Sequence, residues 1–132
     1  DIFGPQLVMD RFDGVHDKVT KLLLSSADIS VEDLVRTVSD IGGVCVPAHV
    51  DRTSYSIISN LGFIPPSCDI KTVELSRRAD RDTVMKSFPD LREFRIISSS
   101  DAHYLRNILE REAFINIGYL DISNVIDYLR GL

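Results

Sequence analysis

Short apolar runs rich in β-branched residues alternate with segments of helical periodicity along most of this chain. The apolar runs cover residues 43–50, 70–76, 94–100 and 113–118, and the helical patterns between and after them cover residues 54–63 and 121–132. Runs that are apolar on both faces are typical of parallel strands that helices cover on both sides. The alternation therefore predicts an α/β fold of mainly parallel, right-handed βαβ units, in an open or a closed sheet.

The first third of the sequence carries a hairpin pattern followed by a helix pattern. Two apolar-rich runs within residues 6–26 flank Asp13 and Gly14, a dipeptide that supplies the positive φ angles of a tight turn. Ser30 precedes apolar residues at helical spacing, and a pair of glycines ends that run at Gly42. These signals predict a peripheral β-hairpin and then a helix with Ser30 as its N-cap.

Length and composition indicate one domain, with residues 1–29 as a hairpin region and residues 30–132 as the βα units. Of the 132 residues, 44% are hydrophobic, which is enough to form a core. The net charge of −5 disfavours a nucleic-acid surface, which needs many positive charges. Two cysteines are too few for a disulfide scaffold, and no run is apolar enough to span a bilayer or to act as a signal segment. We therefore expect a cytoplasmic protein.

Histidine and carboxylate side chains lie at or just beyond the ends of three predicted strands. His49 lies at the end of the first run, Glu74 near the end of the second, and Asp101 and His103 follow the third. In parallel α/β folds, the loops at the carboxyl ends of the strands form the ligand site. Imidazole nitrogens and carboxylate oxygens together suit zinc, manganese or iron. The sequence therefore predicts a metal site that would activate water for attack on a phosphoryl group.

Each candidate ligand also has a structural interpretation, and the sequence leaves both open. Asp101 can cap a helix that starts near Tyr104, with His103 on the surface. His49 can be a buried, hydrogen-bonded loop residue. The third histidine, His16, is interpreted as a solvated residue of the hairpin. The joint placement of His49 with Asp101 and His103 favours a shared site over these separate structural roles.

Three arginines and one cysteine, Cys68, are weaker candidates for the same site. Arg52, Arg77 and Arg78 stand just beyond predicted strand ends, where guanidinium groups could bind phosphate oxygens. Charged runs of this kind are more often solvated. Cys45 is expected to pack in the core, and Cys68 lies in a loop as a weak candidate for a thiol ligand.

Three motifs resemble, in order and separation, the carboxyl-terminal motifs of the polymerase and histidinol phosphatase (PHP) superfamily of metal-dependent phosphoesterases. They are VPAHVDR, VELSRRAD and ISSSDAHYL, at residues 46–52, 73–80 and 97–105. The segment YSIISNLGFIPP also resembles a bacterial PHP subgroup. The resemblance implies the carboxyl-terminal part of a distorted (β/α)7 barrel. It further implies two or three metal ions, commonly zinc, manganese or iron, at the carboxyl ends of the strands.

The resemblance assigns roles to some residues and leaves others without one. Carried over by motif, His49, Asp101 and His103 would be ligands of different metal ions, and Glu74 would only line the site. The family's His-x-His and Thr-Asp-His motifs and its metal-bridging glutamate do not occur here. Together with a start at DIFGPQ, this implies a carboxyl-terminal piece of a metalloenzyme that binds metal weakly and is inactive alone. Its partners would be the missing N-terminal part of the domain and a small phosphorylated substrate.

Two functions remain open for the complete domain. One is a metal-dependent phosphoesterase, and the other is a non-catalytic PHP-like scaffold or regulatory interaction module. A proofreading nuclease linked to a polymerase is disfavoured by the acidic charge. Because a cut barrel exposes strand edges, we expect the hairpin near Gln6 to Leu24 to cover an edge, or two copies of the chain to pair.

Overall fold

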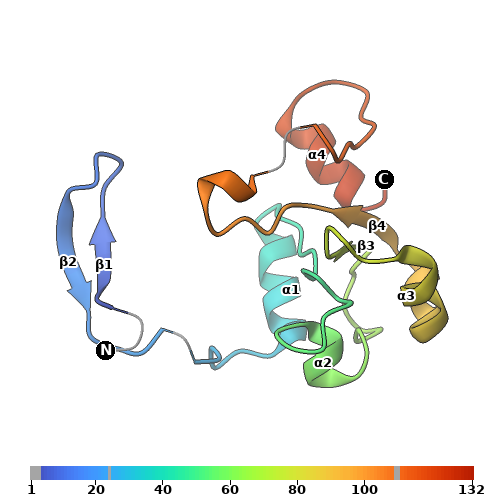
Figure 1. Cartoon of the computed structure of the whole chain (residues 1–132), viewed down its shortest axis with the longest axis horizontal. Helices are drawn as coiled ribbons and strands as arrows, with labels where there is room; N and C mark the ends of the chain where they lie inside the picture. The colour runs from blue at the N-terminus through green and yellow to red at the C-terminus, as the bar shows by residue number, and fades with distance from the viewer. Residues whose placement is uncertain (1–3, 24, 109–110) are drawn as a thin grey trace.

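The computed structural model is a mixed α/β structure with two separate two-stranded sheets (Figure 1). It describes residues 4–23, 25–108 and 111–132. The strands are β1 (Gln6–Met9), β2 (Val15–Val19), β3 (Thr72–Leu75) and β4 (Arg95–Ser98). The helices are α1 (Val31–Asp40), α2 (Ile57–Leu61), α3 (Arg81–Ser87), α4 (Ile122–Leu129) and the 3-10 helices η1 (Pro89–Glu93) and η2 (Leu105–Asn107). Within these residues, no helix has the length and apolar character needed to cross a bilayer.

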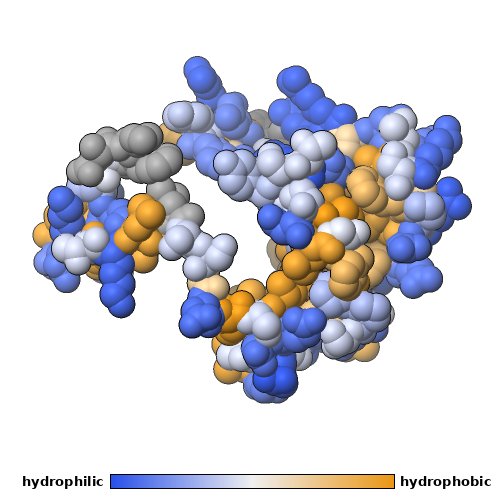
Figure 2. All heavy atoms as spheres, turned by 90° about the horizontal axis from the view of Figure 1, so that it is seen from below, coloured by the Kyte–Doolittle hydropathy of each residue, from blue (hydrophilic) through white to orange (hydrophobic). Residues whose placement is uncertain are grey.

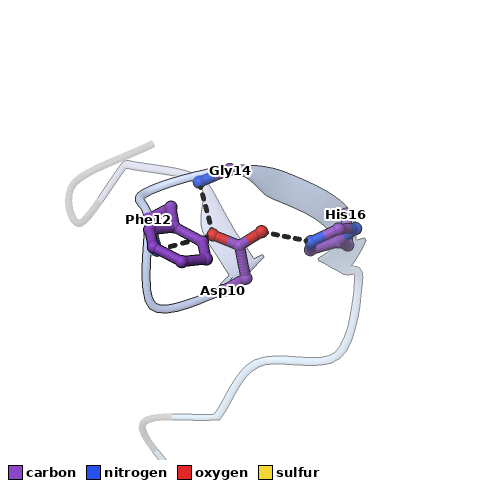
Figure 3. A network of polar contacts seen from close by, with 4 residues as sticks. All are labelled: Asp10, Phe12, Gly14 and His16. Atoms are coloured by element: carbon purple, nitrogen blue, oxygen red, sulfur yellow. Dashed lines mark hydrogen bonds and ion pairs between the residues drawn. The ribbon is translucent and has the colours of Figure 1, made fainter.

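The predicted hairpin is confirmed, because β1 and β2 pair in antiparallel orientation. Asp13 supplies the left-handed turn with a φ of +63°, whereas Gly14 does not adopt a positive φ. The carboxylate of Asp10 closes the loop by accepting hydrogen bonds from the backbone N–H groups of Phe12 (2.8 Å) and Gly14 (2.9 Å) (Figure 3). The hairpin loop is therefore held by hydrogen bonds within the loop itself.

The hairpin lies apart from the other elements and is joined to α1 by residues 20–30 (Figure 1). Among the described residues, β1 and β2 form a sheet of their own and pair with neither β3 nor β4. The expectation that the hairpin covers an edge of the parallel sheet is therefore wrong, because the hairpin strands hydrogen-bond only to each other among the described residues. Pairing between two copies stays a prediction.

The strands β3 and β4 are parallel neighbours, which confirms a parallel pair. Their register runs from Thr72 opposite Arg95 to Leu75 opposite Ser98. The chain between them forms α3 and η1, so that β3, α3 and β4 make one βαβ unit. The sequence pattern does not predict α3, because the first turn of this helix lies in a run of charged residues and has no side-chain cap hydrogen bond.

The predicted strand at residues 43–50 is not a strand in the structure, although its end lies beside β3. The N–H of Glu74 donates to the carbonyl oxygen of Pro47, and the N–H of Val50 donates to the carbonyl oxygen of Glu74, both at 2.9 Å. The register slips between these two bonds, where His49 has a φ of +35°. Pro47 also has no N–H to donate, so that the ladder cannot extend.

The predicted strand at residues 113–118 is also not a strand. A groove of about 570 Å³ separates this segment from β4, and it is lined by Ile96 and Ile97 on one side and by Phe114 and Ile115 on the other. The backbone of the segment therefore does not reach the ladder that β3 and β4 form. Its apolar pattern predicted an extended, covered segment but could not specify a hydrogen-bonding partner.

The core is formed by residues of α1, β3, α3 and η1 and of the loops between them, and β1 and β2 contribute none of its residues. Its buried apolar residues are Val35, Val50, Cys68, Ile70, Val73, Leu75, Met85 and Leu91. Cys45 packs against this cluster, which confirms its predicted structural role. The hydroxyl of the buried Thr72 donates to the carbonyl oxygen of Leu129 at 2.7 Å, which fixes α4 to β3.

The chain exposes far more surface than a compact protein of its mass. Its accessible surface is 10495 Å², whereas a compact protein of this mass exposes about 7,000 Å². Figure 2 shows apolar residues, in orange, along the side of the body that borders the opening next to the hairpin. The large total surface therefore includes exposed apolar side chains.

The N-terminus of α1 provides a direct test of the capping prediction. The hydroxyl of Ser30 accepts a hydrogen bond from the N–H of Asp33 at 3.0 Å. Replacing Ser30 with alanine removes this acceptor, so we expect the free energy of unfolding to fall by about 1 kcal/mol. Chemical denaturation followed by circular dichroism measures the change. In contrast, Ser39→Ala, at an exposed site in the last turn, should change it by less than about 0.5 kcal/mol. Equal losses in the two variants would contradict the capping role.

Candidate functional site

The loop that carries His49 lies at the carboxyl end of β3. Val50 anchors this loop, because its side chain is 0% exposed and its N–H donates to Glu74 in β3. His49 has a φ of +35°, in a region that non-glycine residues seldom occupy. Its Nδ1 atom is buried and has no hydrogen-bond partner among the described residues. The interpretation of His49 as a hydrogen-bonded core histidine therefore leaves this nitrogen unexplained.

Asp101 follows β4 and turns toward the loop of His49. Its φ is +47°, and its Oδ2 atom lies 2.7 Å from the guanidinium group of Arg52. The short helix η2 begins only after Tyr104 and has no side-chain cap hydrogen bond. The interpretation of Asp101 as a helix cap is therefore wrong, because its carboxylate pairs with Arg52 instead.

The ring of His103 is exposed, and the backbone of Asp101 fixes its orientation. The Nδ1 atom of His103 lies 2.8 Å from the carbonyl oxygen of Asp101. A carbonyl oxygen only accepts, so this contact places the proton on Nδ1 and leaves a lone pair on Nε2 in the neutral ring. Metal-ligating histidines commonly have this arrangement, with the second nitrogen bonded to a carbonyl or carboxylate. Nε2 is therefore the atom of His103 available to a ligand.

Arg52 connects three loops at one edge of the parallel pair. Its backbone N–H donates to the carbonyl oxygen of His49 at 3.0 Å. Its side chain contacts the hydroxyl of Ser76 at 3.3 Å and the carboxylate of Asp101 at 2.7 Å. The neighbouring Asp51 accepts a hydrogen bond from the N–H of Ser76 at 2.6 Å. The loops that follow β3 and β4 are therefore joined to the loop of His49 by Asp51 and Arg52.

Two members of this network, Asp51 and Ser76, were not identified from the sequence as site residues. Both belong to motifs that resemble the PHP superfamily, VPAHVDR and VELSRRAD. Their position inside those motifs was the available signal. Their contact could not be read from the sequence, because it joins segments that are distant along the chain.

The remaining candidates lie near this edge in different environments. Glu74 is half-buried within β3. A single nitrogen of Arg77, Nη2, contacts both carboxylate oxygens of Glu112, at 2.9 and 2.8 Å, and Arg78 is exposed. Arg77 and Arg52 are thus each paired with a carboxylate in this structure, and phosphate binding by any of the three arginines stays a prediction.

Cys68 and His16 lie outside the candidate site. Cys68 is buried in the core, and this burial raises the pKa of its thiol, which disfavours the thiolate that a metal binds. The Nε2 atom of His16 lies 2.8 Å from the carboxylate of Asp10 in the exposed hairpin (Figure 3). The hydrogen bond to His16 is the main cause that lowers the pKa of the Asp10 carboxyl group. His16 is therefore a surface residue, as predicted.

The candidate ligands do not form a complete metal site by themselves. Among residues 4–23, 25–108 and 111–132, no three histidine, cysteine, aspartate or glutamate side chains lie close enough to hold one ion. The structure brings Asp101 to the loop of His49 through Arg52, without assembling a full set of ligands.

Comparison of the chain with protein-family models, with curated proteins and with solved structures gives no match. The PHP resemblance therefore depends on the three motifs and the bacterial-subgroup segment alone. What it implies about fold, metal and activity is accordingly a proposal.

Proposed function

We propose that this chain is the carboxyl-terminal part of a metal-dependent phosphoesterase domain of the PHP type. In this proposal, β3 and β4 are neighbouring strands of a distorted (β/α)7 barrel. A missing N-terminal part of the same domain supplies the other strands and the remaining metal ligands. The observation that carries the proposal is the link between Asp101 and the loop of His49, at the carboxyl edge of a parallel strand pair.

The candidate ligands fit a transition metal in kind, although they are too few. His49 has a buried ring nitrogen with no hydrogen-bond partner in the described part of the chain, and His103 keeps a lone pair on Nε2. With the carboxylate of Asp101, they offer the nitrogen and oxygen donors that zinc, manganese and iron accept. His49 and Asp101 also have positive φ angles, and backbone strain of this kind clusters at functional sites. An ion needs about four or more ligands, so further ones must come from elsewhere.

The proposed chemistry is hydrolysis of a phosphate ester. A bound metal ion of this class would lower the pKa of a coordinated water and withdraw charge from a phosphoryl oxygen. His49, Asp101 and His103 would hold and orient different metal ions of the cluster. Nearby arginines, such as Arg77 and Arg78, would bind the phosphate oxygens. In the overall reaction, the oxygen of water bonds to phosphorus, the phosphorus–oxygen ester bond breaks, and alcohol and phosphate leave.

Mn²⁺ binding to the purified chain tests the ligand assignment. We expect His49→Ala and His103→Ala each to weaken Mn²⁺ binding by about tenfold or more, because each removes a donor from a small set. Paramagnetic broadening of amide NMR signals measures even weak binding and shows where the ion lies. The matched control is His16→Ala, which removes an exposed histidine that is paired with a carboxylate in the hairpin. Equal affinity in all three variants, or broadening confined to the hairpin, would contradict the assignment.

A second candidate function is a non-catalytic PHP-like scaffold or regulatory interaction module. The large exposed surface of the chain favours it, because such a surface suits association with another polypeptide. The complete domain distinguishes the two functions. If His103→Ala in that domain removes both bound metal and hydrolysis of phosphate monoesters, the enzyme is supported. Unchanged behaviour of this variant would support the module.

A further inference from the structure

We propose that the side chain of Arg52 exchanges partners. It holds Asp101 when Asp101 binds no cation, and it binds an anionic phosphate group when a divalent cation takes Asp101. This inference rests on the proposed function, and it adds a coupling between cation binding and anion binding through one residue.

The contacts of Arg52 leave much of its guanidinium group available. A guanidinium group has five N–H donors. In this structure, Nη2 contacts one carboxylate oxygen of Asp101, and Nε contacts the hydroxyl of Ser76 at the longer distance of 3.3 Å. The side chain is 43% exposed, so a ligand can reach its other donors from solvent.

The backbone of Arg52 is held firmly while its side chain is free to turn. Its N–H donates to His49 at 3.0 Å, and its carbonyl oxygen accepts a hydrogen bond from the hydroxyl of Ser56 at 2.9 Å. Ser56 and the preceding Val50 are both buried. A change of partner therefore needs only side-chain rotation, with the loop unchanged.

The ion pair between Arg52 and Asp101 is weak enough to be replaced. Both side chains are partly exposed, at 43% and 27%, and ion pairs in such positions contribute little to stability. A divalent cation bound by the carboxylate carries twice the charge of the guanidinium group. The displaced guanidinium group would then lie at the edge of the site, where two of its N–H groups suit two oxygens of a phosphate.

Thermodynamic linkage makes this exchange measurable. If a cation frees Arg52 for an anion, the anion must raise the affinity for the cation by the same factor. Direct attraction between cation and anion also gives a positive coupling, so that a coupling alone does not identify Arg52. The effect of Arg52 on cation binding without an anion separates the two causes.

The experiment titrates Mn²⁺ into the purified chain, with and without saturating methylphosphonate, and follows the NMR signals. We expect methylphosphonate to raise the Mn²⁺ affinity of the wild-type chain by about tenfold. Arg52→Gln removes the competitor for Asp101, so we expect this variant to bind Mn²⁺ alone about threefold more tightly. The effect of methylphosphonate should then fall to about twofold. Arg52→Lys keeps the charge and should retain part of the coupling.

The control is Arg36→Gln, which removes an exposed arginine paired with Asp33 on α1 and should behave as the wild type. Weaker binding of Mn²⁺ alone by Arg52→Gln would mean that Arg52 only positions Asp101, and it would overturn the exchange. Equal coupling in the wild type and Arg52→Gln would overturn it as well, while the metal site itself stands because Mn²⁺ still binds. No Mn²⁺ binding by any variant would overturn the exchange in this chain, whereas the proposed function is tested separately by metal binding and hydrolysis in the complete domain.

Discussion

Leu91→Ala should leave a large fraction of the chain unfolded at 25 °C. Leu91 lies in η1, is 2% exposed and belongs to the core. Truncation of a buried leucine costs about 2–5 kcal/mol, because apolar contact is lost and a cavity remains. The chain has little stability to lose, since an unfolded chain of this mass exposes about 21,500 Å² and the folded chain still exposes 10495 Å². Folding thus buries only about half of the surface, less than the roughly 60% that a 60-residue domain buries.

Urea denaturation followed by circular dichroism measures this loss. The matched control is Leu120→Ala, because Leu120 is 96% exposed and its truncation removes almost no buried contact. The control should change the free energy of unfolding by less than about 0.5 kcal/mol. Unfolding of both variants at the same urea concentration would mean that η1 does not stabilise the core.

Elements with local signals could be predicted from the sequence, and α1 is the clearest example. Its N-cap, its apolar spacing and its terminal glycine all lie within a few residues of one another. The hairpin was identified for the same reason, because a turn dipeptide lies between two apolar runs. By contrast, α3 begins among charged residues without a side-chain cap hydrogen bond, so that its local signal is weak.

Strand pairing depends on distant segments, and it was predicted less well. The apolar character of residues 43–50 and 113–118 indicated covered, extended chain, but not a hydrogen-bonding neighbour. In residues 43–50, the strand hydrogen bonding to β3 is interrupted at His49, which has a positive φ. A histidine in the sequence does not by itself predict a positive φ. Residues 113–118 are separated from β4 by a groove. Pro47, which has no N–H for a strand ladder, is a local signal against the strand at residues 43–50. The groove beside residues 113–118 has no signature within the segment.

In the candidate site, too, the positions of single residues could be predicted from the sequence, whereas contacts between distant segments could not. The rule that ligands lie beyond the carboxyl ends of parallel strands selected His49 and Asp101 from the sequence alone. The pairing of Asp101 with Arg52 could not be selected, because the two residues come from loops far apart in the chain. Arg52 was singled out only as a phosphate ligand. Its present partner is a candidate metal ligand, and this conflict is the basis for the proposed exchange.

The isolated chain should also self-associate. It exposes about 3,500 Å² more than a compact protein of its mass, and burial of about 800 Å² on each partner is enough for a specific dimer. We expect the hairpin to provide the contact, because β1 and β2 pair only with each other among the described residues. Leu7, Met9 and Val15 are exposed on these strands. Unpaired strand edges with apolar side chains favour pairing with another chain.

Sedimentation at increasing protein concentration tests this association. The average mass of the wild-type chain should rise from 14.8 kDa toward twice that value. Met9→Lys places a charge on the exposed hairpin and should raise the dissociation constant of the dimer by about tenfold or more. Ile41→Lys is the matched control, because it charges an exposed apolar site at the end of α1 and should leave the constant unchanged. A folded wild-type chain that stays at 14.8 kDa throughout would contradict the association, and equal effects of the two lysines would exclude the hairpin as the contact.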